Sequence, residues 1–112
     1  MRSKLLATAA GLCLAACIAA CTKNQDETKI PLPEKGKRVY LANCIACHNA
    51  DPTKDGPIGP AIAGSSLELV RARVMEASYP SGYMPKRQSK AMAPLPQLKD
   101  QLDALHAFLN QT

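Results

Sequence analysis

Apolar residues recur with the period of a helix in three stretches of the chain, residues 34–47, 65–78 and 98–111. In each stretch, apolar or small side chains follow one another at spacings of three and four, which places them on one face of a helix. The three faces consist of Gly36, Tyr40, Cys44 and Cys47, then Leu67, Val70 and Val74, and finally Leu98, Leu102, Leu105 and Leu109. Ser65 and Glu68 form an S-x-x-E pattern, so we expect a capping box at the start of the second helix.

Two segments rich in proline and glycine, residues 49–64 and 78–97, separate these stretches. Neither has helical periodicity, and a loop as long as the second is usually functional or disordered. The sequence shows no convincing strand and no internal repeat. We therefore expect one small all-α domain with three main helices and long loops.

The first 20 residues have the composition of an export signal. Two basic residues precede an apolar run from Leu5 to Ala20, and sixteen residues are short for a spanning helix. The run ends in IAAC, which resembles a bacterial lipoprotein signal, so cleavage before Cys21 and lipidation of that residue are expected. LAAC, ending at Cys17, is a second match. Cys21 is favoured because polar residues follow it at once.

Cleavage at this position would leave a flexible tether over residues 21–33 and a domain over residues 34–112. The expected location is the periplasmic side of a bacterial membrane, to which the lipid would hold the protein. The formal net charge of +5 is modest and includes two charges of the signal. No nucleic-acid partner is expected.

The stretch CIACH, residues 44–48, carries the candidate chemistry. Cys44 and Cys47 are one helical turn apart, so both sulfurs can bond to neighbouring groups of one planar ligand. His48 can then place its imidazole beneath the same ligand. This arrangement suits one covalently attached haem c whose iron is bound by His48. With only four aromatic side chains in the chain, such a group would also fill the core.

Other interpretations of this motif stay open. A structural zinc ion needs four ligands, and beyond CIACH the domain offers only His106, which is expected to be solvated or to cap its helix. A thioredoxin-like site would follow a strand in a βαβ unit, and none is visible. A disulfide between Cys44 and Cys47 would close a very small loop. A chance match is the simplest explanation.

The sequence GKRVYLANCIACH closely resembles the N-terminal helix and haem-binding motif of class I c-type cytochromes. In that family a glycine and an aromatic residue, here Gly36 and Tyr40, pack against an L-x-x-aromatic pair of the last helix, here Leu105 and Phe108. A glycine suits this position because two helices cross closely there. The resemblance covers residues 34–112 and implies a cytochrome c-like fold around one haem.

The resemblance also implies the remaining contacts of the iron site. The Pro60 carbonyl would accept a hydrogen bond from His48 Nδ1 and so fix the imidazole tautomer. A methionine from the loop before the last helix would be the sixth iron ligand. Met92 is favoured because it lies six residues before Leu98. Met84 is the alternative, because a proline follows it directly, as is frequent in the family.

A His/Met pair leaves no open iron position and raises the reduction potential. The primary expectation is a membrane-anchored monohaem carrier of single electrons between redox partners outside the cytoplasm, not an enzyme. Lys86, Arg87 and Lys90 would steer docking to acidic partners, an effect that salt weakens. The alternatives are a fixed subunit of a larger dehydrogenase or oxidase, a sensor or peroxidase-like protein with an open sixth site, and a haem-free thiol–disulfide protein.

Overall fold

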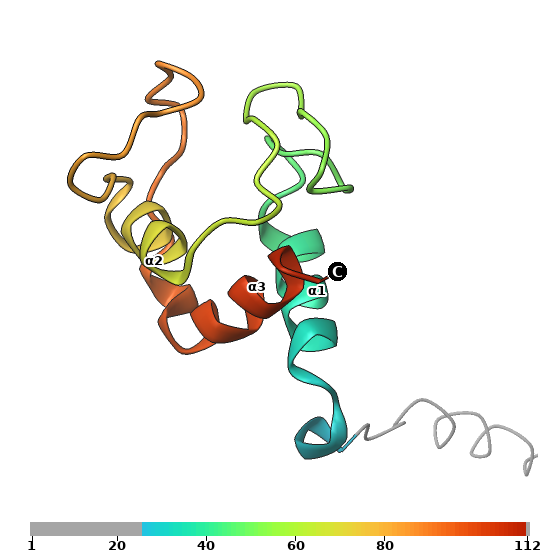
Figure 1. The fold of residues 1–112 in the computed structure, drawn as a ribbon. Helices are drawn as coiled ribbons and strands as arrows, with labels where there is room; N and C mark the ends of the chain where they lie inside the picture. The colour runs from blue at the N-terminus through green and yellow to red at the C-terminus, as the bar shows by residue number, and fades with distance from the viewer. Residues whose placement is uncertain (1–25, 112) are drawn as a thin grey trace, which may run out of the picture.

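The computed structural model describes residues 26–111, which form a helical domain with no strand in that range (Figure 1). Its elements, in chain order, are η1 (Glu27–Lys29), α1 (Leu32–Asn43), α2 (Leu67–Glu76), η2 (Pro96–Gln101) and α3 (Leu102–Leu109). The expected all-α class with three main helices is confirmed. No helix in residues 26–111 is both long and apolar enough to span a bilayer. The predicted signal, Cys21 and the first residues of the tether lie outside the described range.

Helix α1 begins two residues before the predicted start and ends four residues before the predicted end. Pro33 in its first turn suits the beginning of a helix, where the missing amide hydrogen has no intrahelical partner. Beyond Asn43 the chain tightens, and the Cys47 amide bonds the Cys44 carbonyl at 3.2 Å. The motif therefore occupies a turn at the end of the helix, which frees the Cys47 carbonyl for contacts with the next loop.

The start of α2 corrects the predicted capping box by one residue. Ser66, not Ser65, is the N-cap, and its hydroxyl accepts a hydrogen bond from the Leu69 amide at 3.2 Å. The Ser65 hydroxyl instead donates to the Ile62 carbonyl at 2.6 Å. The helix ends at Glu76, and its C-cap Ala77 has a left-handed φ of 53°. With Ser66 as the N-cap, the residue three positions later is Leu69, which cannot return the bond that Glu or Gln makes in a capping box. The cap is therefore a single hydrogen bond.

The predicted last helix is two elements. Residues Pro96–Gln101 form the 3-10 helix η2, and α3 proper starts only at Leu102. Neither element has a side chain that caps its N-terminus. Without such a cap, the first free amides form hydrogen bonds within a tight 3-10 turn. One example is the Leu98 amide, which donates to the Leu95 carbonyl at 3.0 Å.

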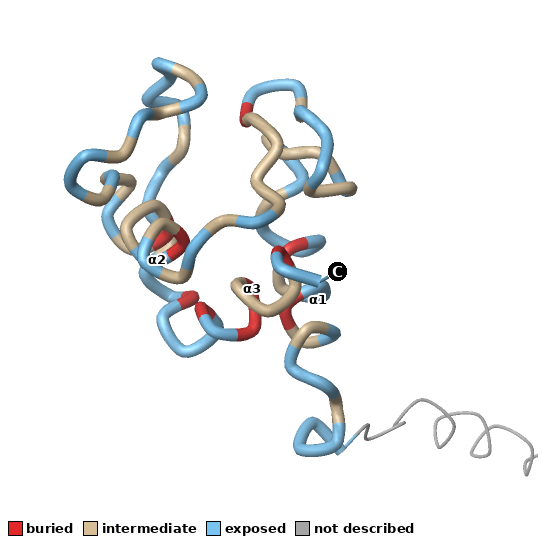
Figure 2. Tube along the Cα trace, in the orientation of Figure 1, coloured by how far each residue is buried: buried red, intermediate tan, exposed pale blue. Residues whose placement is uncertain are grey.

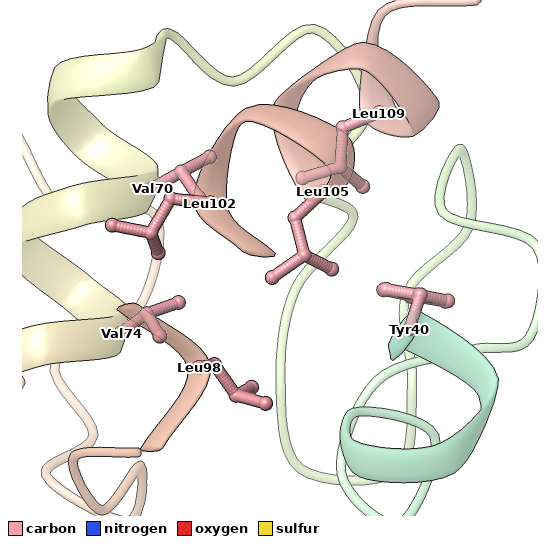
Figure 3. Packing of buried hydrophobic residues seen from close by; sticks show 7 residues of the cluster. All are labelled: Tyr40, Val70, Val74, Leu98, Leu102, Leu105 and Leu109. Atoms are coloured by element: carbon pink, nitrogen blue, oxygen red, sulfur yellow. The ribbon is translucent and has the colours of Figure 1, made fainter. Parts of the chain in front are cut away.

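The core forms where α1, α2, η2 and α3 meet, and burial is concentrated there (Figure 2). The loop 78–97 is mostly exposed, whereas the loop 49–64 is largely a mixture of half-buried and exposed residues. Figure 3 shows the side chains of this cluster, which are Tyr40, Val70, Val74, Leu98, Leu102, Leu105 and Leu109. The aromatic rings of Tyr40 and Phe108 pack with their centroids 5.2 Å apart. The segments 49–64 and 78–97 project from the helices toward the same end of the domain (Figure 1).

Contact between α1 and α3 is close at Gly36. A Cβ atom built at this glycine would overlap the carbonyl group of Ala104 and lie 2.9 Å from the Phe108 Cβ. The backbones can approach this far only because residue 36 has no side chain. The expected helix crossing at Gly36 is therefore present in the structure.

Gly36→Ala tests this crossing. The added methyl group has to push α1 and α3 apart, so we expect the free energy of unfolding to fall by about 2–3 kcal/mol, the upper part of the overpacking range. Lys37→Ala, on an exposed position of the same helix, should change it by less than about 0.5 kcal/mol. Urea unfolding followed by circular dichroism measures both. Equal midpoints for the two variants would contradict the close crossing.

Candidate functional site

A cavity of about 340 Å³ opens between the helices and the two long loops. Cys44, Cys47 and His48 line it together with Met92, and core side chains complete its walls: Tyr40, Val70, Val74, Leu105 and Leu109. The volume lies within the range of about 300–1,000 Å³ that is usual for ligand sites, and such sites are mostly apolar with few polar groups. Three residues of the motif therefore face one largely apolar space.

The imidazole of His48 is held from one side by the loop that follows the motif. Its Nδ1 lies 3.0 Å from the Pro60 carbonyl oxygen, which can only accept a hydrogen bond. Nδ1 therefore carries the hydrogen, and Nε2 keeps its lone pair for a metal ion. The imidazole is thus oriented as an iron ligand needs.

Gly59 is a residue of the site that the sequence analysis did not single out. It is buried, and a Cβ atom there would overlap the His48 ring. The Gly59 amide also donates to the Cys47 carbonyl at 2.8 Å, as the Ile58 amide does at 3.2 Å. The loop consequently folds directly against the motif. Its place directly before Pro60, in the stretch GPAIAG (residues 59–64), was the available signal in the sequence.

The two methionines lie in different environments. Met92 is partly buried, packs against the core cluster and lines the cavity. Met84 is 83% exposed and is not among the cavity-lining residues of the described chain. The structure therefore brings Met92, and not Met84, to the space that His48 faces.

The thiols of the motif are not joined by a disulfide. Burial raises the pKa of the Cys44 thiol to about 11, and the neighbouring Cys47 adds to this. A thiol–disulfide enzyme needs a thiol whose pKa is lowered, so this environment does not favour that alternative. Nor does any group of three or more His, Cys, Asp or Glu in residues 26–111 come together as a metal site, and His106 does not line the cavity.

These residues fit the haem that the sequence resemblance implies. Two thiols lie on the wall of an apolar cavity, and one oriented imidazole and one thioether line the same space. Thiols can form the covalent links, and imidazole with thioether is a common axial pair for haem iron.

Tyr40 links this site to the core. Its side chain is fully buried, and its hydroxyl donates to the Asn49 carbonyl at 2.6 Å, directly after the motif. Burial raises the pKa of the phenol to about 12, and Cys44 and Asp51 contribute to this. The core of α1 and the end of the motif are thus joined by one short hydrogen bond.

Tyr40→Phe removes that bond, and at neutral pH we expect a loss of about 1 kcal/mol in the free energy of unfolding. The fold favours the neutral phenol, because its pKa rises from 10.0 to about 12. This contribution is fully present below pH 10 and is lost as the pH rises through about 12. Urea unfolding at stepped pH should show the wild type losing stability relative to the variant over that range. Parallel pH profiles would contradict the shift.

Comparison with protein-family models identifies the family of this chain. The model described as Cytochrome c matches residues 33–112, which is most of the chain. Searches of curated proteins and of solved structures found no significant match. The family implies a covalently bound haem c with its iron, and the spacing of Cys44 and Cys47 agrees with that attachment. The helical fold, the cavity and the matched range together show that this chain belongs to the cytochrome c family.

Proposed function

We propose that this chain is a membrane-anchored, monohaem carrier of single electrons whose iron is bound by His48 and Met92. Membership of the cytochrome c family supports the general function of a haem-based electron carrier. The observation that carries the proposed iron ligation is that the candidate ligands line one cavity. The oriented His48 ring, both motif cysteines and Met92 all line it.

Each group of the chain has a defined part in this proposal. When bound, haem supplies an iron that alternates between the ferrous and ferric states. Cys44 and Cys47 would hold it covalently, and the Pro60 carbonyl keeps the proton on Nδ1 of His48. The apolar walls limit the access of water, which also influences the reduction potential. No residue is required to move a proton or to bind a substrate.

Two variants test the ligand set in the ferric, haem-loaded protein. Met92→Ala should lose the methionine-to-iron charge-transfer band, because its thioether lines the cavity. Met84→Ala is the matched control and should keep the band, since its side chain is 83% exposed. The opposite pattern in the optical spectra would show that Met84 is the ligand.

A sensor or peroxidase-like protein is the main competing function, and it requires an open sixth position. Carbon monoxide binding by the ferrous wild type at neutral pH would favour it over the carrier. A fixed subunit of a dehydrogenase or oxidase would instead purify together with its partners. The partly buried Met92 in the cavity supports the closed iron site of a carrier.

Location is the next part of the proposal. Cytochrome c domains typically function outside the cytoplasm. We propose that Cys21, after cleavage of residues 1–20, carries lipid that holds this domain on the periplasmic side of a bacterial membrane. The basis is the sequence IAAC after a short apolar run.

Cys21→Ser tests the anchor. The Cys21 thiol is the proposed site of lipid attachment. When cells are fractionated, this variant should therefore be absent from the membrane fraction that detergent extracts and present in the soluble extracytoplasmic fraction. Cys17→Ser is the matched control and should stay with the membrane. If only Cys17→Ser releases the protein from the membrane, the lipid is attached to Cys17 and not to Cys21.

Docking to acidic redox partners stays a prediction. Of the three cations expected to steer it, Lys86 and Arg87 donate to backbone carbonyls of the facing loop, at 2.8 and 2.7 Å. Lys90 is exposed on the same segment. We expect their positive charges to attract acidic partners to this part of the surface. Because salt screens such attraction, the rate of electron transfer to an acidic partner should fall as the salt concentration rises.

A further inference from the structure

Two cations of the segment 78–97 reach across to the loop that holds His48. Arg87 Nη1 donates to the Ile58 carbonyl at 2.7 Å, and Lys86 Nζ donates to the Ala61 carbonyl at 2.8 Å. Both side chains also line the cavity. Their two acceptors immediately flank Gly59 and Pro60, the residues that contact the His48 ring.

Asp55 strengthens the same junction from the loop's side. Its Oδ2 lies 3.4 Å from Arg87 Nη2, and its Oδ1 accepts a hydrogen bond from the Ala61 amide at 2.8 Å. That backbone hydrogen bond, followed by the charges of Arg87 and Lys86, lowers the pKa of the carboxyl group. Asp55 is therefore ionised at neutral pH and binds both its own loop and the cation facing it.

Met92 lies five residues beyond Arg87, on a stretch with few other attachments. After it, the Leu95 amide bonds the Val74 carbonyl at 2.6 Å. Within the described chain, the hydrogen bonds recorded between residues 84–94 and other segments are those of Lys86 and Arg87. Besides the packing of its side chain on the core cluster, Met92 therefore lies between two hydrogen-bonded attachments, one to α2 and one to the loop of His48.

We propose that Asp55, Lys86 and Arg87 form a clasp that positions Met92, and that opening of this clasp controls how fast an outside ligand replaces it on the iron. This proposal rests on the proposed ligation by His48 and Met92. When the clasp is open, hydrogen bonds hold the stretch around Met92 at one end only, and the packing of its side chain on the core cluster is the remaining restraint. Its thioether then leaves the iron position more often. These three residues are positioning residues, because each acts through the loops and not on the iron.

Imidazole binding to the ferric, haem-loaded protein measures this opening. At saturating imidazole the stopped-flow rate reports how often the sixth position is vacated. Arg87→Gln should raise it about fivefold, the factor that corresponds to ~1 kcal/mol for one hydrogen bond. Lys86→Gln should raise it similarly. Lys90→Gln makes the same charge change on the same segment and is the control that should leave the rate unchanged. Equal rates in all three variants would overturn the proposal.

Asp55→Asn tests the contribution of the ion pair separately from that of the hydrogen bonds that Lys86 and Arg87 donate to carbonyls. The amide keeps an acceptor for Ala61 but loses the charge that pairs with Arg87. Because this pair is exposed, we expect an increase of less than about threefold in the imidazole rate. Raising the salt concentration should bring the wild-type rate toward that of the variant. A wild-type rate that is independent of salt, together with an unchanged Asp55→Asn rate, would remove the ion pair from the clasp.

Two further measurements distinguish failure of the clasp from failure of the ligand assignment. Met92→Ala should bind imidazole fast, and adding Arg87→Gln should not accelerate it further. If Met92→Ala binds slowly, the assignment of Met92 is wrong. Amide hydrogen exchange over residues 88–93 still tests the clasp in that case, because Arg87→Gln should accelerate it at an unchanged urea midpoint. Unchanged exchange and an unchanged imidazole rate in Arg87→Gln would refute the clasp alone.

Discussion

The close crossing of α1 and α3 at Gly36 is the constraint on which the rest of the structure depends. The two backbones can touch there because no side chain intervenes. This contact lets the Tyr40 ring pack at a tilt of 47° against Phe108 and become fully buried. The Tyr40 hydroxyl then donates to the Asn49 carbonyl, so the crossing also helps to fix where the turn with both cysteines and His48 ends.

Around this crossing the helices leave an apolar space that their own side chains do not fill. A chain with four aromatic residues has little bulk with which to close it. The cytochrome c family implies a covalently bound haem c, and small domains commonly need such a bound group for stability. On the proposed ligation, stability and electron transfer depend on the same cavity, with the two proposed iron ligands on its walls.

The loops provide the polar part of the site, and they do so with backbone groups. The Pro60 carbonyl orients the imidazole, while the amides of Ile58 and Gly59 bind the Cys47 carbonyl. Carbonyls on both sides of Gly59 and Pro60 in turn accept hydrogen bonds from Lys86 and Arg87. One short loop thus contacts the motif on one side and the methionine-bearing segment on the other, which connects both axial positions proposed for the iron.

The sequence by itself determined the features that depend on residues close together in the chain. Helical periodicity and the C-x-x-C-H spacing predicted three helices and the haem motif, whereas the crossing at Gly36 was expected from the family resemblance. Only the tertiary structure decided the end of α1, the cap at Ser66 and the 3-10 start before Leu102, because each depends on which partner a free backbone group finds. The same holds for the cavity-facing position of Met92 and for contacts of Lys86 and Arg87 that span 25 and 29 residues. No local pattern encodes such distances, since they follow from how two irregular loops lie on the assembled helices.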